Sequence, residues 1–254
     1  MKHEIKMIVL DLDGTLLRND KTISDYSKEV IQKCRKKGIK VIFATAHGTT
    51  DDIAPNNLFD GCVKKSGAVA YDGEKLMYQR VMPIEDIREL LLACDAAGLK
   101  TAVQRMDDKT HYANFNVSAV WPHITYFKAI NFAEINFDVD KAYAITETPE
   151  AVNTIKCNLP RGVYLFASRD NLTFISHQEA IKSKATAALA EHWGIKQAEI
   201  VGFGDDVIDI DLLQYCGVGI AMGNALEEVK AAADYICDTN ENDGAAKWIE
   251  EHVF

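Results

Sequence analysis

MIVLDLDGT, residues 7–15, is the stretch on which the interpretation of this sequence depends. Its first four residues are apolar and include β-branched Ile8 and Val9, so they predict a short buried strand. Because side chains alternate along a strand, Asp11 and Asp13 should project to the same side where it ends. In an open α/β sheet, ligands bind at the carboxyl ends of the strands. Two such carboxylates repel unless a cation or phosphoryl group lies beside them, so the stretch predicts either a functional site or an Asp-rich surface turn.

A second acidic cluster lies far downstream. Residues 200–203 are again apolar and strand-like, and GDDVID follows at 204–209. The ends of parallel strands meet at one edge of a sheet, so four carboxylates are expected in one crevice: Asp11, Asp13, Asp205 and Asp209. These groups ionise together only around a hard cation, and Mg²⁺ fits their oxygen ligands. The alternative, that Asp205 and Asp206 are helix N-caps, does not explain why both strand ends are acidic.

Strand and helix patterns alternate at both ends of the chain. A helix between Ser24 and Gly38, followed by a strand at 39–44, continues a βαβ unit. The middle instead carries short strand-like segments, at 99–104, 111–115, 141–145, 162–167 and 171–176, with a helix candidate at 149–159. We therefore expect an α/β domain with a doubly wound, mostly parallel sheet at 1–81 and 178–254. A small α+β domain at 82–177 is expected as an insertion, in which 117–137 shows no assignable pattern.

A threonine after the second predicted strand and two lysines before the second acidic strand each allow two interpretations. Thr45, after the second strand, could cap a short helix opened by Asp51 and Asp52, or could donate to a phosphate oxygen. Lys182 and Lys184 begin a long helix just before the second acidic strand. A lysine there could offset the charge of a transferring phosphoryl group, whereas most helix lysines form a solvated face.

Composition narrows the class of protein. The chain has 254 residues, with 28 Lys and Arg against 38 Asp and Glu, and this charge balance disfavours nucleic acid or an anionic membrane as partner. Its six cysteines form no C-x-x-C pair and most sit among apolar neighbours, so we expect buried, reduced thiols. No apolar signal core precedes the first strand, and no run approaches the ~18 apolar residues of a membrane span. A cytoplasmic protein is expected.

Several motifs together resemble the haloacid dehalogenase-like phosphatases. They are DLDGTL after a strand, a Thr at the next strand end, a K-x-x-A helix start at 182–185, and a G-D-x-x-x-D turn at 204–209. The block AMGNA at 221–225 resembles the Cof-type subfamily, and the resemblance covers nearly the whole chain. It implies a Rossmann-like core, a large α+β cap domain inserted after the third strand, and Mg²⁺-dependent phosphatase activity.

The resemblance also implies roles for individual residues. Asp11 would be the nucleophile that forms an aspartyl phosphate, and Asp13 would protonate the leaving alcohol and then deprotonate the attacking water. The implied Mg²⁺ site comprises Asp11, the main-chain carbonyl of Asp13, Asp205 and, as an orienting residue, Asp209. The implied phosphate site comprises Thr45, the amide of Ala46 and Lys182.

The sequence departs from the family pattern at four places. The usual A-T-G-R ends in Ala46-His47, N-G-A is S-G-A at 66–68, Ser183 replaces Gly, and Ile208 replaces the Asn of G-D-x-x-N-D. We expect a phosphatase acting on a small phosphorylated metabolite. A sugar phosphate is the first hypothesis, because polar and aromatic residues mark the insertion: Arg105, His111, Tyr112, Trp121 and His123. The alternatives are a phosphotransferase or mutase with the same nucleophile, or a weakened phosphometabolite-binding protein, for which His47 and Ile208 argue.

Overall fold

Two units make up the computed structural model, which describes residues 4–48, 50, 54, 56–105, 109–122, 124–167 and 171–254. One unit takes the described residues up to Gln79 and from Ile181 to Phe254, and the other is Arg80–Ala180. The sequence pattern predicts these boundaries at 81/82 and 177/178. The helix expected at Asp51 and Asp52, and His123, lie outside the described residues.

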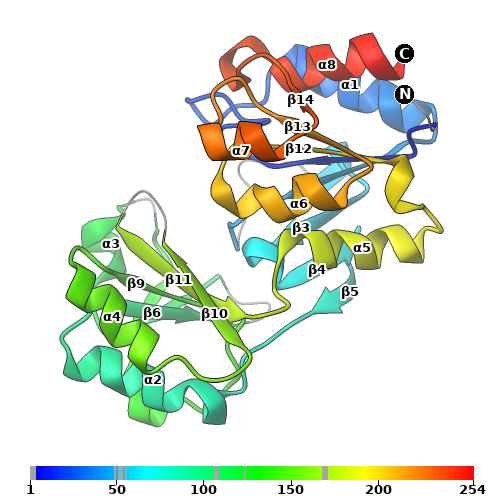
Figure 1. Cartoon of the computed structure of the whole chain (residues 1–254). Helices are drawn as coiled ribbons and strands as arrows, with labels where there is room; N and C mark the ends of the chain where they lie inside the picture. The colour runs from blue at the N-terminus through cyan, green and yellow to red at the C-terminus, as the bar shows by residue number, and fades with distance from the viewer. Residues whose placement is uncertain are drawn as a thin grey trace. The chain divides into compact units, whose positions relative to one another are not determined.

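The first unit is built on a sheet with helices on both faces (Figure 1). Its described strands are β1 (Met7–Leu10), β2 (Lys40–Ala44), β3 (Gly61–Lys64), β4 (Val69–Asp72), β5 (Lys75–Gln79), β12 (Ile200–Gly204), β13 (Val218–Ala221) and β14 (Tyr235–Ile236). Its described helices are α1 (Asp25–Lys36), α5 (Lys182–His192), α6 (Ile210–Tyr215), α7 (Glu227–Ala232) and α8 (Gly244–Val253). The strand order is β14-β13-β12-β1-β2-β3-β4-β5, parallel from β14 to β3 and antiparallel from β3 to β5. The predicted doubly wound, mostly parallel sheet is confirmed.

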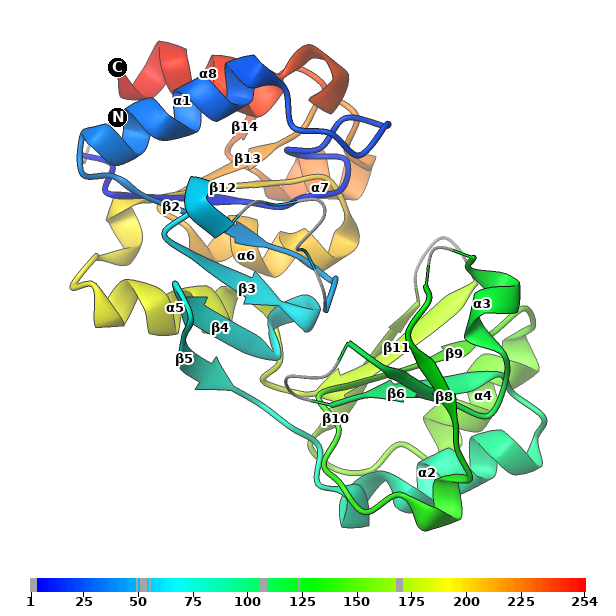
Figure 2. The same ribbon diagram turned by 180° about the vertical axis from the view of Figure 1, so that it is seen from behind.

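Strand β1 is apolar throughout because both of its faces are covered. Ile8 and Leu10 pack into a core with α1 and α8, whereas Met7 and Val9 pack into a second core with α5 and α6. Figures 1 and 2 show these helix pairs on opposite faces of the sheet. A strand buried on both faces loses the alternation of apolar and polar residues, which explains the continuous run at 7–10.

The second unit, Arg80–Ala180, is an α+β structure, as predicted for the insertion. Its described strands are β6 (Thr101–Gln104), β7 (His111–Ala113), β8 (Phe127–Ala129), β9 (Lys141–Ile145), β10 (Val163–Ala167) and β11 (Leu172–His177). Its described helices are α2 (Ile84–Ala96), α3 (Val117–Val120) and α4 (Pro149–Cys157). The sheet order is β10-β11-β9-β6-β7-β8, antiparallel except between β7 and β8. Helices α2 and α4 pack on one face, and the other face carries aromatic residues that include Tyr143 and Trp121.

The described residues contain neither a membrane-spanning helix nor a disulfide. None of the helices in the described residues is long and apolar enough to cross a bilayer. The cysteines are free: four are buried, Cys237 is half-buried and Cys157 is exposed.

The turn after β3 approaches the start of α5 closely. Gly67 has φ +103°, and a Cβ built on it would lie 2.2 Å from the main-chain carbon of Ile181. Only glycine combines this backbone angle with this approach. The close packing of this turn against Ile181 therefore fixes the start of α5 at Lys182.

Gly67→Ala should destabilise the protein more than Gly73→Ala does. Gly73 also has a positive φ, but a Cβ there would meet no atom within 4 Å, so only the left-handed backbone penalty of about 1–2 kcal/mol applies. Overlap with the main chain should make the Gly67 variant worse by a further ~1–3 kcal/mol in urea unfolding. Equal losses in the two variants would contradict the close approach.

Candidate active site

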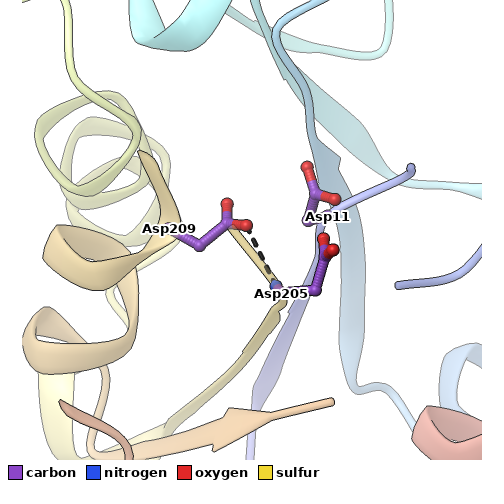
Figure 3. Close-up of side chains that lie close together, drawn as sticks. All are labelled: Asp11, Asp205 and Asp209. Carbon is purple, nitrogen blue, oxygen red and sulfur yellow. Dashed lines mark hydrogen bonds between the residues drawn. The ribbon is translucent and has the colours of Figure 1, made fainter. Parts of the chain in front are cut away.

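The carboxyl ends of β1 and β12 bring three carboxylates together. Leu10 pairs with Phe203 in the parallel register, and the amide of Asp11 donates to the carbonyl of Phe203 at 3.1 Å. Asp205 follows directly after β12. One carboxylate oxygen from each of Asp11, Asp205 and Asp209 lies within 4.8 Å of the others (Figure 3). The sequence argument that both acidic strand ends meet at one edge is therefore correct for these three residues.

Lys182 joins two of these carboxylates from the start of α5. Its Nζ donates to Oδ1 of Asp11 and to Oδ1 of Asp209, both at 2.6 Å, and its side chain is only 1% exposed. Helix α5 is fixed here because the amide of Ser183 donates to Oδ2 of Asp211 at 2.9 Å. Fully ionised, the three carboxylates together with the one ammonium would give the cluster a net charge of −2. A hard divalent cation complements both this charge and the oxygen ligands.

Burial and the neighbouring charges set the pKa values of Asp11 and Lys182. Burial raises the pKa of Asp11 well above its usual range, and the nearby charge of Asp209 adds to this, although Lys182 acts in the opposite direction. Burial by itself would lower the pKa of Lys182, but the charges of Asp11 and Asp209 outweigh it and raise that pKa, so Lys182 stays protonated.

Asp209 also closes the turn that carries Asp205. Its Oδ2 accepts from the amides of Asp205 and Asp206, both at 3.1 Å, and one of these bonds is drawn in Figure 3. The side chain of Asp206 accepts from the amide of Val207 at 2.7 Å. The N-cap interpretation thus holds for Asp206, and Asp209 combines a capping role with its bond to Lys182.

The loop after β1 packs tightly against Asp205. Gly14 has φ +74°, and a Cβ there would lie 2.4 Å from Oδ2 of Asp205. The side-chain amide of Asn224 donates to the carbonyl of Gly14 at 2.7 Å, and the amide of Leu226 donates to the carbonyl of Asp205 at 3.2 Å. The AMGNA block therefore supports the acidic site, a role that the sequence analysis did not assign to it.

Asp13 has different partners from the other acidic residues. Its carboxylate is absent from the group of three, although the sequence analysis expected it in the same crevice. Oδ1 accepts from Lys21 Nζ and Oδ2 contacts His47 Nε2, both at 2.5 Å. Burial would raise the pKa of Asp13, but first His47 and then Lys21 lower it well below its usual range. In the sequence, His47 stands out only as a departure from the family pattern, and no motif marks Lys21.

Thr45 and Ala46 lie after β2, beside the end of β1. The amide of Thr45 donates to the carbonyl of Val63, and its buried Oγ1 accepts from the amide of His47 at 3.1 Å. A hydroxyl that accepts one bond still has a proton to donate. The phosphate-binding roles of Thr45, Ala46 and Lys182 remain predictions. Ile208 is half-buried in the short 3-10 turn Val207–Asp209.

Comparison with known proteins gives one consistent result. A family model described as haloacid dehalogenase-like hydrolase matches residues 8–249. The chain is 27% identical to a 5-amino-6-(5-phospho-D-ribitylamino)uracil phosphatase of Bacillus subtilis strain 168, covering 98% of this chain and 96% of that one. A second phosphatase of the same name and organism is 25% identical over 99% of both chains. A solved sugar phosphatase of HAD subclass IIB matches with a TM-score of 0.86 and 25% identity, covering 97% of this chain and 98% of the other.

Lys182→Met should destabilise the protein strongly, because it leaves two buried carboxylates without their cation. Losing one partner of a buried ion pair costs about 3–5 kcal/mol. Lys36→Met, at an exposed lysine in the last turn of α1, is the control and should change stability by no more than ~0.5 kcal/mol. Urea unfolding in chelator measures both. A Lys182 variant as stable as the Lys36 variant would show that the pair contributes nothing.

Proposed function

The chain belongs to the haloacid dehalogenase-like hydrolases, and we propose that it is a Mg²⁺-dependent phosphatase that hydrolyses a small phosphorylated metabolite through an aspartyl phosphate. The observation that carries this proposal is the buried Asp11 carboxylate at the end of β1, held by Lys182 and bordered by Asp205 and Asp209. A carboxylate fixed in this way is oriented for attack on phosphorus.

In the first half-reaction, Asp11 attacks phosphorus, an Asp–O–P bond forms, and the ester P–O bond breaks. Asp13 gives its proton to the departing oxygen, so the product is a neutral alcohol. Asp13 must be protonated for this step, and an approaching phosphate dianion favours that form because a like charge raises a carboxyl pKa. Lys182 offsets the negative charge on the transferring group.

In the second half-reaction, Asp13 accepts a proton from a water molecule as that water attacks the phosphorus of the aspartyl phosphate. The bond to Asp11 breaks, which regenerates the carboxylate and releases inorganic phosphate. The ionised Asp13 that His47 and Lys21 favour is the form that this step requires.

The acidic cluster has the charge and oxygen ligands for Mg²⁺. Asp11, Asp205 and the main-chain carbonyl of Asp13 would hold it, and both oxygens of Asp209 are already hydrogen-bonded, which suits an orienting role. When bound, the ion neutralises charge on the phosphoryl oxygens.

We infer a sugar or polyol phosphate as the substrate class. Two of the relatives carry names that specify a phosphoribityl compound, and a structural neighbour is named a sugar phosphatase. In the second unit, which we propose as the cap domain, His111 Nδ1 lies 2.6 Å from the hydroxyl of Tyr143, near Trp121.

His47 and Ile208 suggested a weakened enzyme, but Asp11, Asp13, Lys182 and Asp205 are all retained, so we propose an active one.

Asp11→Asn should abolish phosphatase activity and leave the fold intact, because an amide does not attack phosphorus. Asp13→Asn should lower the rate by roughly 10²–10⁴-fold, the range for general acid–base catalysis. Asp25→Asn, at an exposed carboxylate on α1, is the control and should behave as wild type. The assay is phosphate release from a panel of sugar and polyol phosphates. Hydrolysis by Asp11→Asn at the wild-type rate would remove the proposed mechanism.

Chelation should eliminate activity and added Mg²⁺ should restore it, whereas Ca²⁺ should support little because its coordination is larger and looser. Mg²⁺ should also raise the melting temperature of wild type through binding to the folded state, and Asp205→Asn should reduce that increase. Thermal unfolding with and without Mg²⁺ measures this separately from catalysis. Full activity in excess chelator would show that the acidic cluster has another purpose.

A further inference from the structure

The carboxylate of Asp13 is held on both oxygens. Lys21 Nζ donates a hydrogen bond to Oδ1 of Asp13 at 2.5 Å, and His47 Nε2 lies 2.5 Å from Oδ2. Neither partner belongs to the acidic cluster around Asp11. The carboxylate therefore has a defined orientation that its own short side chain does not impose.

The two partners differ in how firmly they are held. The main chain of His47 is fixed on both sides: its amide donates to Oγ1 of Thr45 at 3.1 Å, and its carbonyl accepts from the amide of Lys65 at 3.0 Å. Lys21 reaches Asp13 through a long, flexible side chain that is 60% exposed, whereas the shorter His47 side chain, which is 48% exposed, has fewer rotatable bonds. An exposed lysine pair is weak because solvent screens it and side-chain entropy opposes it.

We propose that His47 is a positioning residue, which orients the Asp13 carboxylate toward the oxygen that Asp13 protonates. This inference rests on the proposed phosphatase reaction. A neutral imidazole with its proton on Nε2 and an imidazolium both donate to Oδ2, so the role does not depend on the charge of His47. Proton transfer requires close approach and alignment, so an Asp13 that rotates freely loses part of its advantage.

The test compares two esters that differ in their need for a proton. p-Nitrophenyl phosphate releases a stable anion, whereas benzyl phosphate releases a strongly basic alkoxide unless an acid protonates it. The measured quantity is kcat/KM, which covers the steps through phosphoryl transfer to Asp11 and excludes later hydrolysis. The variants are His47→Leu, which has no donor, and His47→Gln, whose amide can donate.

His47→Leu should lower kcat/KM for benzyl phosphate by about 10–100-fold, and that for p-nitrophenyl phosphate by no more than about threefold. His47→Gln should recover most of the loss on benzyl phosphate, and Lys21→Met should cause a smaller loss than His47→Leu. The control is His192→Leu, which removes a histidine paired with Asp72 at 3.1 Å elsewhere in the unit. It should leave both esters unaffected, and melting temperatures verify that every variant folds.

Equal losses on the two esters, or no rescue by His47→Gln, would overturn the positioning role while leaving the phosphatase proposal in place. A wild-type protein that hydrolyses p-nitrophenyl phosphate but not benzyl phosphate would also overturn it, because Asp13 would not be acting as an acid. A wild-type protein that hydrolyses neither ester, nor any phosphate of the panel, would overturn the proposed function itself.

Discussion

A single buried ammonium group, that of Lys182, makes the arrangement of acids at this site possible. Asp11 and Asp209 are two neighbouring carboxylates with almost no solvent access, and burying such a pair without a cation between them is strongly unfavourable. Lys182 bonds to both at 2.6 Å, and the burial that would otherwise neutralise it is outweighed by their charges. Because one lysine does not balance three carboxylates, the site keeps the negative charge that makes it suitable for a divalent cation.

The rest of the first unit can be understood as the support for this contact. The turn at Gly67 and the bond from Ser183 to Asp211 determine where α5 begins, and so where Lys182 lies. Asn224 in turn holds the loop at Gly14, which packs against Asp205. These contacts join segments far apart in the sequence, so the geometry of the site depends on the complete first unit and not on any one motif.

Much of the fold and the acidic cluster could be predicted from the sequence, because strand periodicity and strand-end carboxylates are local signals. The helix at Lys182–His192 shows the limit: its start was predicted near Lys182, but the contacts of Gly67 and Asp211 that hold this start come from residues distant in the sequence. The partners of Asp13 were not predicted for the same reason, since nothing near His47 or Lys21 indicates which carboxylate they contact. Segment 117–137 contains α3 and β8, which are too short to produce a periodic pattern.

The central claim is that Asp11 becomes covalently phosphorylated during turnover. The most direct measurement mixes the protein with Mg²⁺ and a phosphomonoester that it hydrolyses, and quenches the reaction rapidly with acid. Mass spectrometry then examines the peptide containing residues 7–15. The account predicts a phosphoryl group on Asp11 that appears during turnover and disappears when the substrate is exhausted. Continued hydrolysis with no phosphorylated peptide, or with the phosphoryl group on a different residue, would contradict it.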